Sequence, residues 1–194
     1  MLIIIEGING AGKSVLIEGL SKTLYKNGIT PYISTPSRCG IDTDVLNLTA
    51  SQYANIFFQS MEKQMLEYIT PLVNNNKIVI MDRFTESTVA YQGVLGGENI
   101  ESLKKRSNNI MSNISNIITI VVDCNEKKAY NRVIRRNKKM QYYKKLTIDD
   151  FRKLRAYYLS LIDNNKYILF DTKNYQHSMR IITALIIYKI INFI

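Results

Sequence analysis

The residues best suited to chemistry lie near the start of the chain, where glycines, a lysine and a serine follow an apolar run. Gly7, Gly12, Lys13 and Ser14 match the pattern G-x-x-x-x-G-K-[ST] in every fixed position. Glycines let the backbone turn tightly and present bare N–H groups to phosphate oxygens, and a following helix directs its positive end at the same anion. We therefore expect this loop to bind ATP. The candidate ATP-binding residues are Gly7, Ile8, Asn9, Gly10, Ala11, Gly12, Lys13 and Ser14.

A second polar group follows the apolar run 78–81. An acidic residue that closes a strand in such a protein is the usual place for a carboxylate on the Mg²⁺ side of the phosphates. That residue is Asp82, and Arg83 beside it can hold a phosphate through two parallel hydrogen bonds. We expect Ser14 and Asp82 to bind Mg²⁺. The alternative is that Asp82 and Arg83 only form a salt bridge at the end of the strand and bind no ligand.

Apolar runs alternate with amphipathic segments, and this alternation predicts the elements that position these residues. Strands are expected at 2–6, 30–34, 77–82, 117–123 and 167–171. Helices are expected at 13–26, 51–74, 100–114, 176–192, from a cap at Asn125 to about 137, and from a cap at Thr147 to about 163. Such an order predicts a parallel sheet with helices on both faces, and ligands bind beyond the carboxyl ends of its strands. Gly7, Asp82 and Asp123 lie at those ends.

Together, the two motifs resemble those of thymidylate kinases. The loop motif is joined by a D-R-F-x-x-S-T-x-A-Y-Q run, which this chain carries at 82–92. Weaker matches at 35–38, 71–72 and 155–161 extend the resemblance over most of the chain. It implies an α/β, three-layer P-loop kinase fold in one domain of residues 1–194. The fold would contain a five-stranded parallel sheet, helices on both faces and a short lid at about 132–146.

The resemblance also implies the reaction: the γ-phosphoryl group of ATP passes to dTMP, giving dTDP and ADP. The catalytic residues would be Lys13, Asp82, Arg83 and the lid residues Arg132, Arg135 and Arg136. The substrate-binding residues would be Arg38, Phe58, Arg83, Ser87, Thr88, Tyr91 and Gln92. Phe58 would stack on the base. Helical spacing supports this choice, because Phe57 falls on the apolar stripe of the helix 51–74 and its neighbour lies about 100° round.

Three positions depart from the family's pattern. Asn9 stands where many members have an acid that helps to place the sugar. Gly10 stands where some members carry an arginine, so the charge on the transferred group must be met by the lid arginines. Glu62 stands four residues after Phe58, where the family often has an arginine that reaches the base or its phosphate. Glu62 could instead accept a hydrogen bond from an amino group and favour a different base.

The charge distribution leaves other classes of protein open. The net charge is +10, and residues 104–155 hold 15 Lys and Arg against 4 Asp and Glu, which predicts a polyanionic partner for this segment. A kinase that handles several phosphates explains it, so nucleic acid is not the expected partner, and a nucleic-acid-binding P-loop NTPase is the remote alternative. Two alternatives are closer to the expected function: a thymidine kinase, or a deoxynucleoside monophosphate kinase of broader base specificity. A thymidine kinase needs a base for the 5′-hydroxyl, for which Asp82 or Glu86 could serve.

The remaining features concern location and assembly. Two cysteines are too few for a disulfide framework, and no signal peptide precedes the first strand, so a cytoplasmic protein is expected. The apolar run 181–194 is shorter than the ~20 residues that span a bilayer, so no membrane partner is expected. The family resemblance alone implies a homodimer, with the apolar face of 51–74 as a plausible contact.

Overall fold

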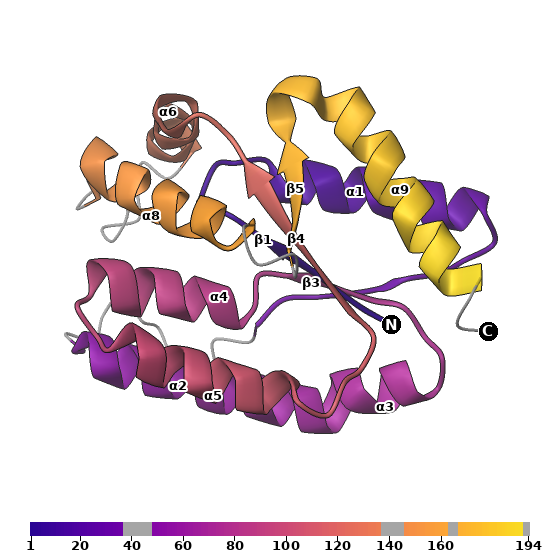
Figure 1. The fold of residues 1–194 in the computed structure, drawn as a ribbon, viewed down its shortest axis with the longest axis horizontal. Helices are drawn as coiled ribbons and strands as arrows, with labels where there is room; N and C mark the ends of the chain where they lie inside the picture. The colour runs from indigo at the N-terminus through magenta and orange to yellow at the C-terminus, as the bar shows by residue number, and fades with distance from the viewer. Residues whose placement is uncertain (37–47, 137–145, 163–166, 192–194) are drawn as a thin grey trace.

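The computed structural model describes residues 1–36, 48–136, 146–162 and 167–191. Within these ranges the chain forms a parallel five-stranded sheet in the order β2-β3-β1-β4-β5 (Figure 1). The strands are β1 (Leu2–Glu6), β2 (Tyr32–Ser34), β3 (Val79–Asp82), β4 (Ile117–Asp123) and β5 (Tyr167–Asp171). The α/β fold with a five-stranded parallel sheet is therefore confirmed.

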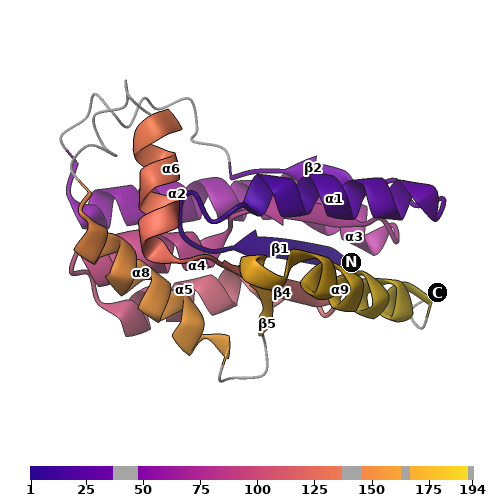
Figure 2. The same ribbon diagram turned by 90° about the horizontal axis from the view of Figure 1, so that it is seen from above.

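Helices cover both faces of this sheet. They are α1 (Lys13–Lys26), α2 (Ala50–Gln64), α3 (Thr70–Asn74), α4 (Thr85–Thr88), α5 (Ile100–Met111), α6 (Glu126–Arg136), α8 (Ile148–Ser160) and α9 (Tyr175–Ile191). Two π-helical segments, η1 (Met65–Ile69) and η2 (Val89–Leu95), continue α2 and α4, and a short 3₁₀ turn, η4 (Thr172–Asn174), precedes α9. Helices α1 and α9 lie together on one side of the sheet, and α2, α4 and α5 lie on the other (Figures 1 and 2).

The central strand β1 explains why the sheet brings the two motifs together. Its four apolar residues are buried, as expected for a parallel strand covered on both faces. It pairs with β3 on one side and β4 on the other, and Ile5 lies opposite Asp82. Because the strands are parallel and in this register, the loop after β1 and the turn after β3 leave the same edge of the sheet.

Helix caps follow the predicted chemistry. Thr147 caps α8, its hydroxyl accepting from the backbone N–H of Asp150 while the Asp150 carboxylate accepts from the backbone N–H of Thr147. The side chain of Asn125 accepts from the backbone N–H of Lys128 at the start of α6. Both predicted helix starts are confirmed.

The structure differs from the sequence expectation in two helical regions. The predicted helix 51–74 is interrupted by the π segment η1, in which Ile69 is buried and Tyr68 is 64% exposed. Residues 85–95 form α4 and η2, although no helix was expected there. Hydrophobic periodicity did not indicate this helix, because Thr85, Glu86 and Thr88 are polar although they are buried.

Among the described helices, none combines the length and the apolar character that a bilayer crossing requires. Helix α9 contains most of the apolar run 181–194 and packs against β5 and α1.

Candidate active site

The glycine-rich loop after β1 has the backbone shape that only glycine adopts readily. Gly7, Gly10 and Gly12 have φ values of 133°, 77° and 109°. A Cβ on Gly7 would lie 2.5 Å from the carbonyl oxygen of Val122, and one on Gly10 would lie 2.4 Å from that of Ala129. Helix α1 starts directly after Gly12, and no side chain among the described residues caps its first N–H groups. These N–H groups are therefore available to an anion.

Lys13 lies inside this loop. Its Nζ donates to the carbonyl oxygens of Gly7, at 3.0 Å, and Ile8, at 3.1 Å. Burial holds the pKa of Lys13 well below its usual range, and the nearby positive charge of Arg83 lowers it further. The charges of Asp82 and Glu6 act in the opposite direction, and a phosphate bound at this loop would add to their effect.

Asp82 and Ser14 face one cavity. The cavity has a volume of about 440 Å³ and lies between α1 and β2, with Ile17, Ile33 and Thr35 among its lining residues. Oδ1 of Asp82 is buried and has no hydrogen-bond partner among the described residues, whereas Ser14 is exposed. The described residues contain no cluster of three or more His, Cys, Asp or Glu side chains that could hold a metal. One carboxylate and one hydroxyl still fit Mg²⁺, which commonly takes few protein oxygens beside substrate phosphates.

Arg83 begins the turn after β3 in a left-handed conformation, with φ of 72°. Its guanidinium donates to Ser87 Oγ at 2.9 Å, to the carbonyl oxygen of Gly7 at 3.2 Å, and to Oδ1 of Asn9. It also lies over the ring of Tyr91, at 5.9 Å from the ring centre. Arg83 thus joins the two sequence motifs, and Asn9 contacts the predicted phosphate-binding arginine.

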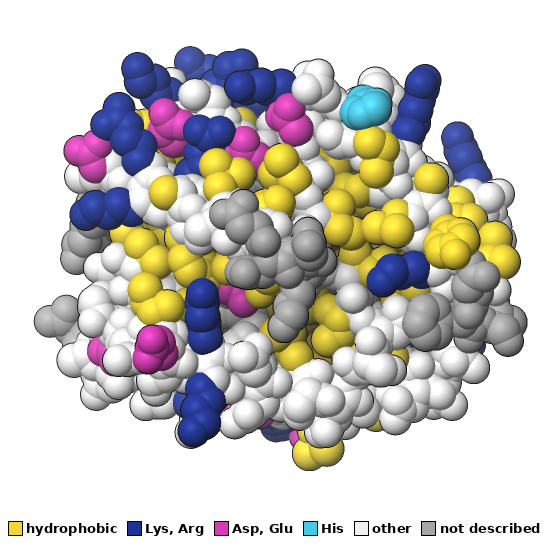
Figure 3. Space-filling view, viewed as in Figure 1, with side chains coloured by type: hydrophobic (Ala, Val, Ile, Leu, Met, Phe, Trp, Pro, Cys, Tyr) yellow, Lys and Arg dark blue, Asp and Glu magenta, His cyan; other side chains and the backbone are white. Residues whose placement is uncertain are grey.

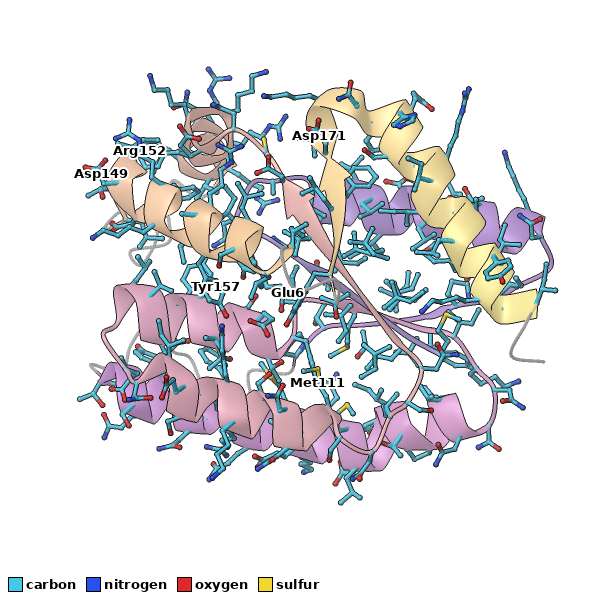
Figure 4. The ribbon with its side chains drawn as sticks, in the orientation of Figure 1. Glu6, Met111, Asp149, Arg152, Tyr157 and Asp171 are labelled. Carbon is cyan, nitrogen blue, oxygen red and sulfur yellow. The ribbon has the colours of Figure 1, made fainter. Side chains whose placement is uncertain are left out.

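Glu6, at the carboxyl end of β1 (labelled in Figure 4), accepts hydrogen bonds from the same turn. Its Oε1 accepts from the backbone N–H groups of Phe84, at 2.7 Å, and Ser87, at 3.1 Å. Its Oε2 accepts from the hydroxyls of Ser87, at 2.7 Å, and Tyr158, at 3.3 Å. Burial raises the pKa of Glu6, and the charge of Arg83 opposes this effect. Glu6 was not among the site residues predicted from the sequence, although a carboxylate that follows four apolar residues at the end of a strand is a usable signal.

The predicted substrate residues on α4 and η2 lie close together. Ser87 and Tyr91 both contact Arg83. Thr88 is the residue after Ser87, and Gln92 is the residue after Tyr91. Thr88 and Gln92 are buried. Oε1 of Gln92 has no hydrogen-bond partner among the described residues. A ligand group that donates a hydrogen bond would satisfy this oxygen.

Phe58 does not lie as helical spacing suggested. The prediction that Phe57 is on the buried stripe and Phe58 faces a cleft is wrong, because Phe58 is fully buried and Phe57 only partly. The buried apolar residues of α2 are Ala54, Phe58 and Met61, so the face differs from the predicted stripe at Phe57 and Phe58. Arg106 of α5 lies over the Phe58 ring, a contact with no local sequence signal.

The three lid arginines lie on α6 within the described residues, whereas most of the expected lid segment 132–146 does not. Arg132 donates to the carbonyl oxygen of Gly10 at 3.0 Å, so it reaches the phosphate loop. Arg135 and Arg136 lie exposed in the last turn of α6, near the residues from 137 to 145 that are not described. Arg38 also lies outside the described residues. Lysines and arginines crowd the surface over α6 and α8 (Figure 3).

Both carboxylate oxygens of Glu86, a candidate base in the thymidine kinase alternative, accept hydrogen bonds from tyrosines. Its Oε1 and Oε2 accept from the hydroxyls of Tyr167, at 2.7 Å, and Tyr157, at 2.5 Å. Tyr157 projects from α8 towards α4 (Figure 4). Burial raises the pKa of both tyrosines, and the Glu86 carboxylate raises it further, so they remain hydrogen-bond donors. With both oxygens occupied, Glu86 is not placed to deprotonate a nucleoside 5′-hydroxyl.

Comparison with known proteins points to one family. A family model described as thymidylate kinase matches residues 5–180. The thymidylate kinase of Mycoplasma genitalium is 29% identical over 191 residues, which cover 92% of this chain and 90% of that protein. That of Mycoplasma pneumoniae is 30% identical over 189 residues, which cover 90% and 88%. That of Ligilactobacillus salivarius is 26% identical over 173 residues, which cover 83% of each chain.

Proposed function

The chain belongs to the thymidylate kinase family, and we propose that it transfers the γ-phosphoryl group of ATP to dTMP through residues gathered at the carboxyl ends of β1 and β3. The observation that carries this proposal is Arg83. Its side chain spans from the phosphate loop, at Gly7 and Asn9, to Ser87 of the acceptor segment. One cation therefore stands where the donor and acceptor phosphates would meet.

The donor phosphates would lie in the loop of residues 7–14. The free N–H groups at the start of α1 and the ammonium of Lys13 would bind them, and Arg132, which already reaches Gly10, would approach from the lid. Arg135 and Arg136 would act from the same side. We propose a lid at about 132–146 within a single domain.

The acceptor would lie along α4 and η2. Arg38 and Arg83 would bind its phosphate, and Tyr91, which packs beneath Arg83, would lie against the sugar. Ser87, Thr88 and Gln92 would bind the rest of the nucleotide, with the unsatisfied Oε1 of Gln92 accepting from the N–H of the pyrimidine.

The acceptor phosphate is already a nucleophile, so the reaction needs alignment and charge neutralisation and no base. Lys13 and Arg83 would follow the negative charge as it moves from donor to acceptor. Ser14 and Asp82 would hold Mg²⁺, since both residues line one cavity and Oδ1 of Asp82 has no hydrogen-bond partner among the described residues. When bound, the metal would neutralise charge on the β- and γ-phosphates.

The first experiment is an ADP-release assay with ATP and Mg²⁺ that offers dTMP, dUMP, dCMP, dGMP and thymidine in parallel. We expect turnover with dTMP, and a loss of about 10³-fold or more in Lys13→Ala, since a cation on the transferred group is worth that much. Lys26→Ala, at the exposed end of α1, is the matched control and should keep full activity. Turnover of thymidine alone, or full activity in a folded Lys13→Ala variant, would refute the proposal.

We also propose a homodimer. Leu66 and Tyr68 on η1 are 76% and 64% exposed, and two such apolar side chains on one segment favour a protein contact. Light scattering at micromolar concentration tests this assignment, and a monomer mass contradicts it. A cytoplasmic location stays a prediction from the sequence.

A further inference from the structure

Arg155 of α8 binds two carboxylates at the junction between β4 and α6. Its Nε and Nη2 donate to the two oxygens of Asp123, at 2.7 and 2.9 Å, and its Nη1 donates to Oε2 of Glu126 at 3.0 Å. Asp123 is the last residue of β4, and Glu126 is the first residue of α6. One guanidinium therefore connects the end of the strand to the start of the helix, through the parallel hydrogen bonds that its planar fork favours.

This group is more enclosed than the pair of Arg152 and Asp149 on the same helix. The side chains of Arg155, Asp123 and Glu126 are 28%, 14% and 16% exposed. Those of Arg152 and Asp149 are 53% and 69% exposed. Charges that lie partly out of water interact more strongly, and removing one partner leaves the other unpaired at a larger cost. Arg155 can therefore fix the geometry of the junction, whereas an exposed pair contributes little.

Strand β4 is the fixed side of this junction. It pairs with β1 and β5, and the carbonyl oxygen of Asp123 accepts from the Thr172 hydroxyl at 2.7 Å. Helix α6 lies outside the sheet and packs against α8 (Figures 1 and 2), where the rings of Tyr130 and Phe151 meet edge to face at 5.4 Å. Because the strand is held by the sheet, the hydrogen bonds of Arg155 locate the start of α6 relative to it.

The helix that Arg155 locates lies directly against the glycine-rich loop. A Cβ on Gly10 would lie 2.4 Å from the carbonyl oxygen of Ala129 on α6. The guanidinium of Arg132, also on α6, donates to the carbonyl oxygen of Gly10 at 3.0 Å. The position of α6 therefore decides both the space beside the loop and the reach of Arg132.

We propose that Arg155 is a positioning residue for phosphoryl transfer: by binding Asp123 and Glu126, it places α6 so that Arg132 reaches the phosphate loop. This inference rests on the proposed function, because it takes this loop to bind the phosphates of ATP. Arg155 acts through Arg132 and touches no reacting group. Its hydrogen-bond partners among the described residues lie on β4 and α6, so its removal should affect ATP and leave dTMP binding unchanged.

The test is a double-mutant cycle of Arg155→Met and Arg132→Met, measured by ADP release. Methionine keeps an unbranched apolar stem and removes the charge and the donors. A misplacement of about 1 Å can cost about 10²-fold in rate, so we expect Arg155→Met to lower kcat/KM for ATP by about 10- to 100-fold. KM for dTMP should stay unchanged. Because Arg155 acts through Arg132, the loss in the double variant should be smaller than the product of the two single losses.

Arg152→Met is the matched control, since it removes the same type of residue from the same helix and breaks only the exposed pair with Asp149. It should change none of these constants. Arg155→Lys keeps the charge without the planar fork, so a smaller loss in the same direction is expected, and it serves as the second variant if Arg155→Met does not fold. Thermal unfolding of each variant is measured alongside, and the kinetics are measured where every variant is folded, so that lower stability alone does not change them.

Single losses that multiply in the double variant would overturn the inference. Equal increases in KM for ATP and dTMP would also overturn it, and so would wild-type kcat/KM for ATP in a folded Arg155→Met variant. Failure of the wild-type protein to phosphorylate dTMP would refute the proposed function instead, so the two failures are distinguishable.

Discussion

Removing the Glu6 carboxylate should destabilise the Arg83 turn and weaken acceptor binding together. In Glu6→Ala the backbone N–H groups of Phe84 and Ser87, which Oε1 accepts at 2.7 and 3.1 Å, lose their partner in a buried place. A buried donor left unsatisfied costs about 1–3 kcal/mol, so the two together predict a loss of about 2–6 kcal/mol in the free energy of unfolding.

Glu6→Gln is the matched control, because it keeps the volume and one oxygen. The amide oxygen can take the place of Oε1, and the amide nitrogen can donate to the hydroxyls that Oε2 now accepts from, Ser87 and Tyr158. We expect a loss of only about 1 kcal/mol, the net worth of one rearranged hydrogen bond.

Urea unfolding of the wild type and both variants measures these free energies, and the ADP-release assay measures KM for dTMP. Glu6→Ala should raise that KM by about tenfold or more, because Glu6 no longer fixes the turn that positions Arg83 and Ser87. A smaller increase in KM is expected for Glu6→Gln. Equal free energies of unfolding for the alanine and glutamine variants, within about 0.5 kcal/mol, would refute the reasoning, because the hydrogen bonds to Oε1 would then contribute nothing measurable to stability.

Three further predictions concern the same framework. Gly10→Ala should cost about 2–5 kcal/mol, from its positive φ and the clash with Ala129, whereas Gly28→Ala, with a similar φ and open space, should cost about 1–2 kcal/mol; similar losses in urea unfolding would contradict this. Arg155→Ala removes the partner of Asp123, whose two oxygens accept at 2.7 and 2.9 Å, and should cost about 2 kcal/mol or more. The exposed pair of Arg152 with Asp149 (Figure 4) predicts a loss near zero for Arg152→Ala, and thermal unfolding compares the two variants. Because burial raises the pKa of Glu6, its contribution to stability is fully present below its unfolded pKa of about 4.3 and is lost as the pH rises through the raised value. Urea unfolding over pH should therefore show the wild type losing stability relative to Glu6→Gln as the pH rises, and a constant difference would contradict it.

Local patterns in the sequence were sufficient for the sheet and the phosphate loop. The spacing of Gly7, Gly12, Lys13 and Ser14 is a short-range feature, because each residue acts within one turn of its neighbours. The apolar runs of β1 and β4 identify buried strands for the same reason, and the caps at Asn125 and Thr147 act over three residues. Parallel pairing of these strands then brings Asp82 to the edge that carries the loop.

Contacts between residues far apart in the chain could not be predicted from local sequence patterns. The buried face of α2 contains Phe58 in place of the predicted Phe57. Periodicity marks a stripe but not which of two adjacent aromatics the neighbouring helices cover.

Length, composition and motif spacing thus determined the fold class, the family and the place where phosphates would bind, because these depend on neighbours along the chain. Only the packed structure decided how the site is held. Glu6 beneath the Arg83 turn and Arg106 over Phe58 join residues more than 40 positions apart. Such pairs form because the sheet and its helices bring them together, and no periodicity along the chain encodes them.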